Sequence, residues 1–131
     1  MLDWSLYENF TEAEMTCKCL CGRADMTVEL MDNLQALRNL CGFPLKVNSG
    51  FRCPDYNDRI ASSGRDGPHT LGAAVDIGIS GTPAHTVLTR AARFNFTGFG
   101  LSQNGPHEGR FIHLDTIQPG MRFPRPWVWS Y

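Results

Sequence analysis

The sequence has no long apolar run, no strong excess of charge of one sign and no low-complexity segment. No stretch approaches the ~20 apolar residues that a membrane-spanning helix needs, so we expect no membrane partner. Its 12 basic and 13 acidic residues give a net charge of −1, which argues against a nucleic-acid partner. Residues 1–10 lack the basic-then-apolar order of a secretory signal. We therefore expect the chain to stay in the cytoplasm of the cell that makes it.

The five cysteines form neither an even set nor a familiar metal motif: Cys17, Cys19, Cys21, Cys41 and Cys53. The CKCLC run lacks the paired C-x-x-C spacing that is typical of zinc sites. Without an export signal, reduced structural thiols are the first interpretation, and one disulfide or a second metal site are the alternatives. A nucleophilic cysteine is not indicated, because no histidine pattern singles one out.

The length of the chain and its proportions of hydrophobic and charged residues predict one globular domain. It has 131 residues, 42% of them hydrophobic and 19% charged, which is enough for a core of its own. Helices are predicted in about residues 11–41. Thr11 and Glu14 have the spacing of a capping box, and leucines at helical spacing in residues 27–41 end before Gly42.

Short strands are predicted in the next part of the chain, about residues 44–116. Alternating residues favour strands at 44–49, 73–79, 97–101 and 111–115, with a helical turn at 53–61 and a helix at 82–94. The tail, residues 117–131, is rich in proline and aromatic residues, and we expect an irregular strap over the core. This order predicts the α+β class, with helices packed on a short, mainly antiparallel sheet.

Two of the predicted strands carry an ionisable residue on the face opposite the core. In residues 73–79 the valine and isoleucines would fill the core, whereas Asp76 faces the other way between two of the smallest side chains. In residues 111–115 the isoleucine and leucine face the core, and His113 faces away. Period-2 alternation therefore places Asp76 and His113 on the non-core faces of their strands.

A third candidate, His69, lies seven residues before Asp76, and Gly72 between them lets the chain turn back. If the two strands are neighbours, His69, Asp76 and His113 converge above one sheet. Two imidazoles and one carboxylate suit a catalytic zinc ion, because they leave its fourth position open. Each residue also has an ordinary interpretation, as a loop histidine, a hydrogen-bonded strand histidine or a satisfied structural carboxylate.

Three motifs together resemble a known family. They are Ser49-Gly50-Phe51-Arg52, then His69-Thr70-Leu71-Gly72-Ala73-Ala74-Val75-Asp76, and Phe111-Ile112-His113-Leu114-Asp115. In this order they resemble the zinc D-Ala-D-Ala carboxypeptidases and the related phage endolysin peptidases, which share the hedgehog-type zinc fold. The resemblance covers nearly the whole chain. It implies a single peptidase domain over residues 1–131, with a zinc site on the sheet.

The resemblance also implies roles for individual residues. His69, Asp76 and His113 would bind one Zn²⁺ per chain, and Arg52 would hold the carboxylate or carbonyl of the substrate, as a guanidinium fork can. The ordinary alternative for Arg52 is a surface salt bridge. Asp115, on the same strand face as His113, would orient a ligand histidine or pair with an arginine.

The sequence departs from the family pattern at two positions. Many relatives have serine two residues before the first histidine ligand, where this chain has Gly67. Some relatives have a catalytic glutamate three residues before the last ligand, where this chain has Arg110. The nearest candidates for the general base are His107 and Glu108, in the loop before the last strand. The alternative for both is a solvated loop residue.

These observations predict zinc-dependent hydrolysis of peptide bonds in bacterial peptidoglycan, by a D-Ala-D-Ala carboxypeptidase or an endolysin-type endopeptidase. The partner would be a peptidoglycan stem or cross-link peptide, and we expect a monomer. The enzyme would act on the wall after release from the cell or as a virion component. The alternatives are a non-catalytic, zinc-containing module that binds a peptide or protein, and a structural protein with a vestigial site.

Overall fold

The computed structural model describes residues 1–120 and 122–131, and its centre is one five-stranded sheet. The strands lie in the order β1-β2-β4-β3-β5. Neighbouring strands are antiparallel except β3 and β5, which are parallel. The bounds are β1 Lys46–Ser49, β2 Ala74–Gly78, β3 Gly98–Ser102, β4 Phe111–Asp115 and β5 Trp127–Ser130. The predicted α+β class with a mainly antiparallel sheet is confirmed.

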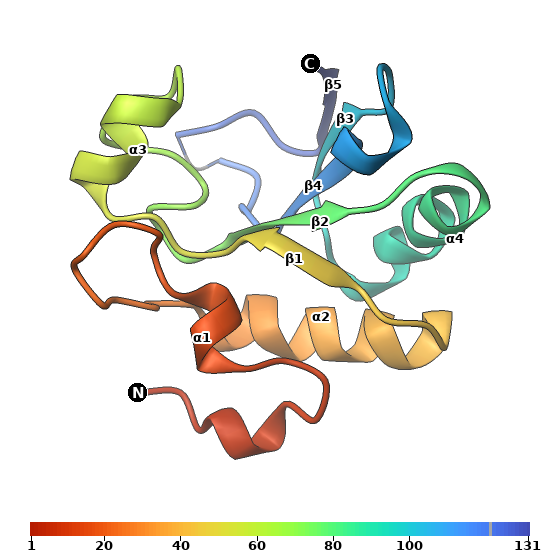
Figure 1. Ribbon diagram of the computed structural model, residues 1–131, viewed down its shortest axis with the longest axis horizontal. Coiled ribbons are helices and arrows are strands. Elements are labelled where there is room, and N and C mark those ends of the chain that lie inside the picture. The colour runs from red at the N-terminus through yellow and green to blue at the C-terminus, as the bar shows by residue number, and fades with distance from the viewer. Residues whose placement is uncertain (121) are drawn as a thin grey trace.

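Short and long helices surround this sheet (Figure 1). The α-helices are α1 Glu12–Met15, α2 Val28–Cys41, α3 Pro54–Ile60 and α4 Gly81–Ala91, and the 3-10 turns are η1 Trp4–Leu6, η2 Ala92–Phe94 and η3 His107–Gly109. In Figure 1, α2 runs beneath the sheet and α3 lies at the opposite side of it. Within the described ranges, no helix is both long and apolar enough to cross a membrane.

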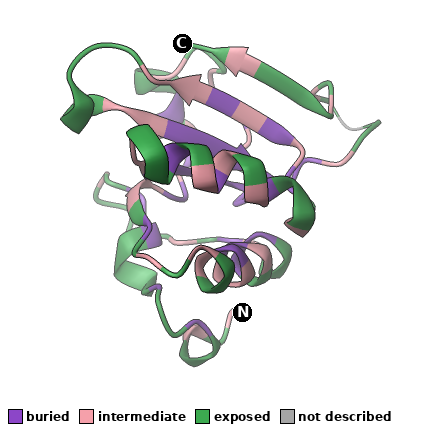
Figure 2. Ribbon diagram, turned by 90° about the vertical axis from the view of Figure 1, so that its right-hand side faces the viewer, coloured by how far each residue is buried: buried purple, intermediate pink, exposed green. Residues whose placement is uncertain are grey.

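The core lies where α2 and α4 pack on one face of the sheet. Leucines of α2 and the inward side chains of β2 and β4 are each 0–1% exposed: Leu30, Leu34, Leu37, Val75, Ile77, Ile112 and Leu114. Burying such a side chain stabilises the fold by roughly 1.5–3 kcal/mol. Figure 2 shows buried segments in the middle strands and exposed residues on the outer sides of the helices. The strand residues that alternate with this set therefore face the other side of the sheet.

The predicted helix ends are confirmed in detail. Thr11 Oγ1 accepts a hydrogen bond from the Glu14 backbone N–H at 3.2 Å, and Glu14 Oε2 accepts from the Thr11 N–H at 2.8 Å. Thr27 Oγ1 accepts a hydrogen bond from the Leu30 N–H at 3.1 Å at the start of α2, and Gly42 ends the helix in the left-handed region with a φ of 74°. These caps satisfy backbone groups that have no partner inside the helix.

The prediction for the tail was wrong in one part. Residues 127–130 are not irregular but form β5, which pairs with β3. The Trp127 N–H donates to Thr97 O at 2.9 Å, and the Tyr131 N–H donates to Leu101 O at 3.1 Å. The last proline of the tail, Pro126, precedes the strand, so the backbone donors beyond it are free to pair. The sheet therefore extends by one strand beyond the predicted set.

Candidate metal centre

The two predicted strand ligands lie opposite one another in the sheet. β2 and β4 are antiparallel neighbours, and Asp76 is the register partner of His113. Both side chains are buried, with 8% and 3% exposure. The strand faces predicted from alternation are therefore those observed, and the pairing of β2 with β4 brings the two groups together.

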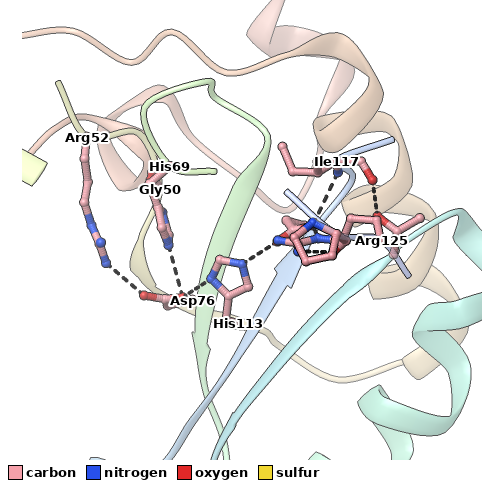
Figure 3. Close-up of polar contacts among 10 residues, drawn as sticks. Gly50, Arg52, His69, Asp76, His113, Ile117 and Arg125 are labelled. Atoms are coloured by element: carbon pink, nitrogen blue, oxygen red, sulfur yellow. Dashed lines mark hydrogen bonds and ion pairs between the residues drawn. The ribbon is translucent and has the colours of Figure 1, made fainter. Parts of the chain in front are cut away.

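His69 reaches the same point from the loop before β2. Its Nε2 lies 3.2 Å from Asp76 Oδ1, and His113 Nδ1 lies 3.1 Å from the same oxygen (Figure 3). The turn that returns the chain uses Gly72, which has a φ of 67° and packs against the backbone of Asp25. One atom from each of His69, Asp76 and His113 lies within 4.8 Å of the other two. The structure thus brings all three predicted ligands together.

Each imidazole has a hydrogen-bond acceptor on the side away from Asp76. His69 Nδ1 lies 2.7 Å from Gly50 O, and His113 Nε2 lies 2.8 Å from Asp115 Oδ2. A carbonyl and a carboxylate can only accept, so with a metal bound each ring would place its N–H there and keep its other nitrogen, which faces Asp76, for the ion. Such partners commonly orient the histidines of a metal site.

The geometry therefore brings three potential ligand atoms, two imidazole nitrogens and one carboxylate oxygen, to one point. Either protons or a metal ion can join these atoms, and a metal ion would contact all three at once. The set consists of two histidines and one carboxylate, which leaves one of four tetrahedral positions open, as in catalytic zinc sites. The residues present fit a zinc ion.

Asp115 is held by an arginine from the tail. Arg125 donates from Nε to Oδ1 at 2.9 Å and from Nη2 to Oδ2 at 2.7 Å. The Arg125 guanidinium also lies over the ring of Trp129, 5.2 Å from its centroid, and the Trp129 ring contacts that of His113. Asp115 therefore both orients a predicted ligand histidine and pairs with an arginine, the two roles considered for it.

Two glycines of β3 leave room for this arrangement. A Cβ on Gly98 would lie 2.3 Å from the Asp115 carboxylate oxygens, and a Cβ on Gly100 would lie 2.7 Å from the Trp129 ring. Any side chain at either position would push the carboxylate or the indole out of place. The site therefore requires glycine at both positions.

Arg52 lies on the other side of Asp76. Its Nη2 donates to Asp76 Oδ2 at 3.0 Å, its Nε to Ser49 Oγ at 3.0 Å and its Nη1 to Asn57 Oδ1 at 3.2 Å. The first motif and the start of α3 thus position the guanidinium. Its side chain is 14% exposed, so one edge of it is open to a ligand.

Burial and neighbouring charges shift the pKa values of the cluster. Burial lowers the pKa of His69 despite the attraction of Asp76. Burial also acts to lower the pKa of His113, but hydrogen bonds to Asp115 and Asp76 outweigh it and raise the value. For both carboxylates burial acts to raise the pKa, but the histidines, and Arg125 at Asp115, hold it well below its usual range. Both carboxylates are therefore ionised at neutral pH, as a metal ligand and its partner require.

The cluster forms part of the wall of a cavity of about 580 Å³. The lining residues come from the three motifs, from the loop after α3 and from the tail: Arg52, Ile60, Ala61, Ser62, Ser63, Pro68, His69, Asp76, Phe111, His113, Phe123, Pro124, Arg125, Trp127, Trp129 and Tyr131. This volume is in the range of small-molecule and peptide sites. A ligand in the cavity would reach the three candidate metal ligands and Arg52 together.

The two predicted candidates for the general base lie elsewhere. His107 and Glu108 form the η3 turn between β3 and β4, and both are exposed. Neither is among the described residues that line the cavity, where Asp76 is the only carboxylate. Arg110, in the position of the family glutamate, donates from Nε and Nη2 to Gly105 O at 3.0 and 2.9 Å. The structure does not bring these three side chains to the cluster.

A hydroxyl lies close to the position where the family serine is replaced by Gly67. The Ser63 Oγ is 2.6 Å from the place that a Cβ on Gly67 would take, and it accepts a hydrogen bond from Asn57 Nδ2 at 2.8 Å. Ser63 also lines the cavity. The loop after α3 therefore supplies a hydroxyl where the sequence pattern lacks one.

Sequence reasoning missed several residues that complete the site. Arg125, Trp129, Gly50 and Ser63 each act through a contact between segments far apart in the chain. The one local signal was the charge of Asp115, which must find a cation if it is buried. Its partner could not be chosen among the arginines from spacing alone.

Comparison with known families agrees with this geometry. The sequence model of the family described as Peptidase M15 matches residues 8–115. The chain belongs to the Peptidase M15 family. The match includes all three candidate ligands and Arg52, so Peptidase M15 membership supports a zinc metallopeptidase and suggests cell-wall peptides as its substrates. Arg125 and Trp129 lie beyond the part that matches Peptidase M15. No curated protein matches the chain.

Proposed function

We propose that the protein hydrolyses peptide bonds in bacterial peptidoglycan, as a D-Ala-D-Ala carboxypeptidase or an endolysin-type endopeptidase. The observation that carries the proposal is the convergence of ligand atoms of His69, Asp76 and His113 on one wall of an open cavity, beside a positioned arginine. Peptidase M15 membership supports the metallopeptidase class. The substrate would be a stem or cross-link peptide.

The three ligands would hold one zinc ion, each in a fixed orientation. When bound, zinc supplies a Lewis acid that lowers the pKa of water to ~7 and polarises a carbonyl. Gly50 O and Asp115 fix the rings of His69 and His113 through their N–H groups, so little reorganisation is needed. Asp76 keeps its second oxygen for Arg52.

Arg52 would bind the substrate carboxylate or carbonyl. Three hydrogen bonds hold its guanidinium at the cavity wall, and a planar fork can pair with a carboxylate through two hydrogen bonds. A D-Ala-D-Ala terminus offers a carboxylate, whereas a bond inside the stem offers a carbonyl. The same residue thus serves both candidate reactions, with a stronger contact to the first.

For proton transfer we retain His107 and Glu108 as candidates. The described lining of the cavity holds no carboxylate besides Asp76 and no histidine besides the two ligands. A carboxylate or imidazole base would therefore come from outside that lining, and η3 lies just before the strand that carries His113. Its approach would require the turn to move when substrate binds. Glu108→Gln and His107→Asn variants would show which residue acts, through a fall in kcat at unchanged zinc content.

The test is digestion of purified peptidoglycan, with mass spectrometry of the released muropeptides. We expect fragments that identify one cleaved bond, complete inhibition by a chelator and recovery with added zinc. His113→Ala should lose this activity and the zinc of the centre. His85→Ala, which changes an exposed histidine of α4, is the matched control and should keep both. Unchanged digestion by His113→Ala would contradict the proposed site.

A non-catalytic module that binds a wall peptide is the second candidate. The observation that favours it is Arg110, whose side chain is turned to Gly105 O in the position where relatives carry the catalytic glutamate. This candidate predicts zinc content and peptide binding without cleavage. Binding of muropeptides in calorimetry, together with an unchanged muropeptide profile, would select it over the enzyme.

A further inference from the structure

Four of the five cysteines gather at one point, although they come from two segments of the chain. Cys17, Cys19 and Cys21 follow α1, whereas Cys53 immediately precedes α3. The four sulfur atoms all lie within 4.8 Å of one another. The fifth, Cys41, is the last residue of α2 and does not belong to this cluster.

The sulfur spacing matches four ligands around a single ion. Cys17 Sγ lies 3.4 Å from Cys19 Sγ, which lies 3.6 Å from Cys53 Sγ. Sulfur atoms ~2.3 Å from a zinc ion, at the corners of a tetrahedron, are about 3.8 Å apart. All five cysteines are free thiols, and the sulfur atoms are well beyond the ~2.05 Å of a disulfide bond.

Two backbone N–H groups donate to sulfur atoms of the cluster. The Cys53 N–H donates to Cys17 Sγ at 3.3 Å, and the Cys21 N–H donates to Cys19 Sγ at 3.3 Å. The Cys21 N–H acts to lower the pKa of the Cys19 thiol, but hydrogen bonds among the thiols and burial outweigh it and raise the value to about 12, so a metal ion must displace that proton. Cys17 and Cys53 are buried and Cys21 is exposed, so an ion could enter from solvent.

We propose that Cys17, Cys19, Cys21 and Cys53 bind a second Zn²⁺ in a closed structural site. Four thiolates fill the tetrahedral positions, so this site keeps no open place for a substrate. Thiolates are soft ligands, which select zinc over magnesium or calcium. Binding releases the thiol protons to solvent and leaves a net charge of about −2 on the ion and its four ligands. Arg23, in the same loop, lies close enough to Cys21 and Cys53 for their charges to interact, and it also pairs with Asp25.

The site would join the loop at residues 17–23 to the turn that carries Arg52. That loop buries little apolar surface, since the side chain of Leu20 is fully exposed. The turn already contacts the N-terminal segment, because the Phe51 N–H donates to Met15 O at 2.9 Å and Gly50 packs on Met15. Zinc at the four cysteines would fix both segments, and with them Gly50 O and the Arg52 backbone.

The experiment measures metal in the full chain, purified under reducing conditions. Wild type and Cys41→Ser should each bind about two zinc ions, whereas Cys21→Ser should bind about one. Cys21 is exposed, so its replacement does not disturb the core. His113→Ala should also bind about one zinc ion, at the cysteine site.

Cobalt substitution identifies which site is filled. The His113→Ala protein loaded with Co²⁺ should show a thiolate-to-cobalt charge-transfer band, and Cys21→Ser and Cys53→Ser should weaken or lose it. Two zinc ions and this band would support the site even if the protein cleaves no peptidoglycan. No sulfur band, or an intact mass that shows disulfides in freshly isolated protein, would overturn it.

Discussion

Two arginine–aspartate pairs flank the candidate metal ligands, and they differ in their access to solvent. Arg125 and Asp115 lie behind His113, with side-chain exposures of 4% and 0%. Arg52 and Asp76 lie at the cavity wall, with exposures of 14% and 11%. Each pair contains a charge-assisted hydrogen bond of 2.7–3.0 Å. The same chemistry therefore occurs in two different surroundings.

This difference in exposure indicates different roles for the two arginines. Arg125 also lines the cavity, but its Nε and Nη2 bind Asp115 and its Nη1 binds Pro124 O, so its main role is to hold Asp115, which holds His113. The open pair leaves an edge of the Arg52 guanidinium free, so Arg52 can bind substrate as well as Asp76. We therefore expect replacement of Arg125 to affect stability and metal affinity, and replacement of Arg52 to affect turnover.

The largest effect is expected for Arg125→Met, which leaves Asp115 buried with too few partners. Removing one partner of a buried ion pair costs ~3–5 kcal/mol of the free energy of unfolding. Loss of the group that orients a ligand also weakens metal binding by about 10–100-fold. Urea unfolding and zinc titration measure the two changes.

The matched control for this variant is Arg122→Ala in the same tail. Arg122 pairs with Asp66 at 3.2 Å, and both side chains are more than half exposed. We expect a change within ~0.5 kcal/mol. Equal effects at Arg122 and Arg125 would remove the distinction between buried and exposed pairs in this tail.

The next effect is expected for Arg52→Lys, which keeps the charge and loses the fork. A hydrogen bond to a charged group contributes about 1.5–3 kcal/mol, so kcat/KM on a muropeptide should fall roughly 10–100-fold. The free energy of unfolding should change by less than ~1 kcal/mol, because lysine keeps a positive charge beside the buried Asp76. A large loss of stability with unchanged kcat/KM would reverse the roles given to the two arginines.

Gly98→Ala tests the buried Arg125–Asp115 pair from β3, the strand next to the one that carries Asp115. Its Cβ would lie 2.3 Å from the Asp115 carboxylate, and relieving that contact should cost ~1–3 kcal/mol of the free energy of unfolding. Gly109→Ala is the control, because its Cβ would have no neighbour within 4 Å. If thermal unfolding shows both variants equally stable, the carboxylate is less tightly placed than its hydrogen bonds imply.

The smallest effect is expected for Trp129→Phe, which retains an aromatic ring near Arg125. The cation–π contact at 5.2 Å should weaken, at a cost of about 0.5–1 kcal/mol in the free energy of unfolding. Trp127→Phe, at an exposed position of the same strand, should change it less. A loss at Trp129 as large as that of Arg125→Met would mean that the indole, and not the ion pair, holds the tail in place.

Local patterns predicted most of the helices and inner strands. The capping residues of α1 and α2 and the alternation in β2 and β4 are decided by neighbours in sequence, so their signals can be read directly. The face of Asp76 and His113 follows from the same alternation. For these residues, the interactions that decide the helix ends and the strand faces are between neighbours in sequence.

The remainder depends on pairings between distant segments, which have no local signature. β5 pairs in parallel with β3, and its proline-rich approach indicated an irregular tail. Arg125 finds Asp115 only because that strand docks, and two glycines of β3 are needed for the fit. The general base lacks such support, and His107 and Glu108 stay predictions based on spacing.

The position of β5 also has a consequence for synthesis of the chain. During translation the segments that carry His69, Asp76 and His113 leave the ribosome before Arg125 and Trp129 do. A nascent chain therefore contains every ligand before it contains the strand and the arginine that hold Asp115. We expect the centre to gain its final orientation only after β5 has left the ribosome, so a nascent chain without β5 would bind zinc weakly.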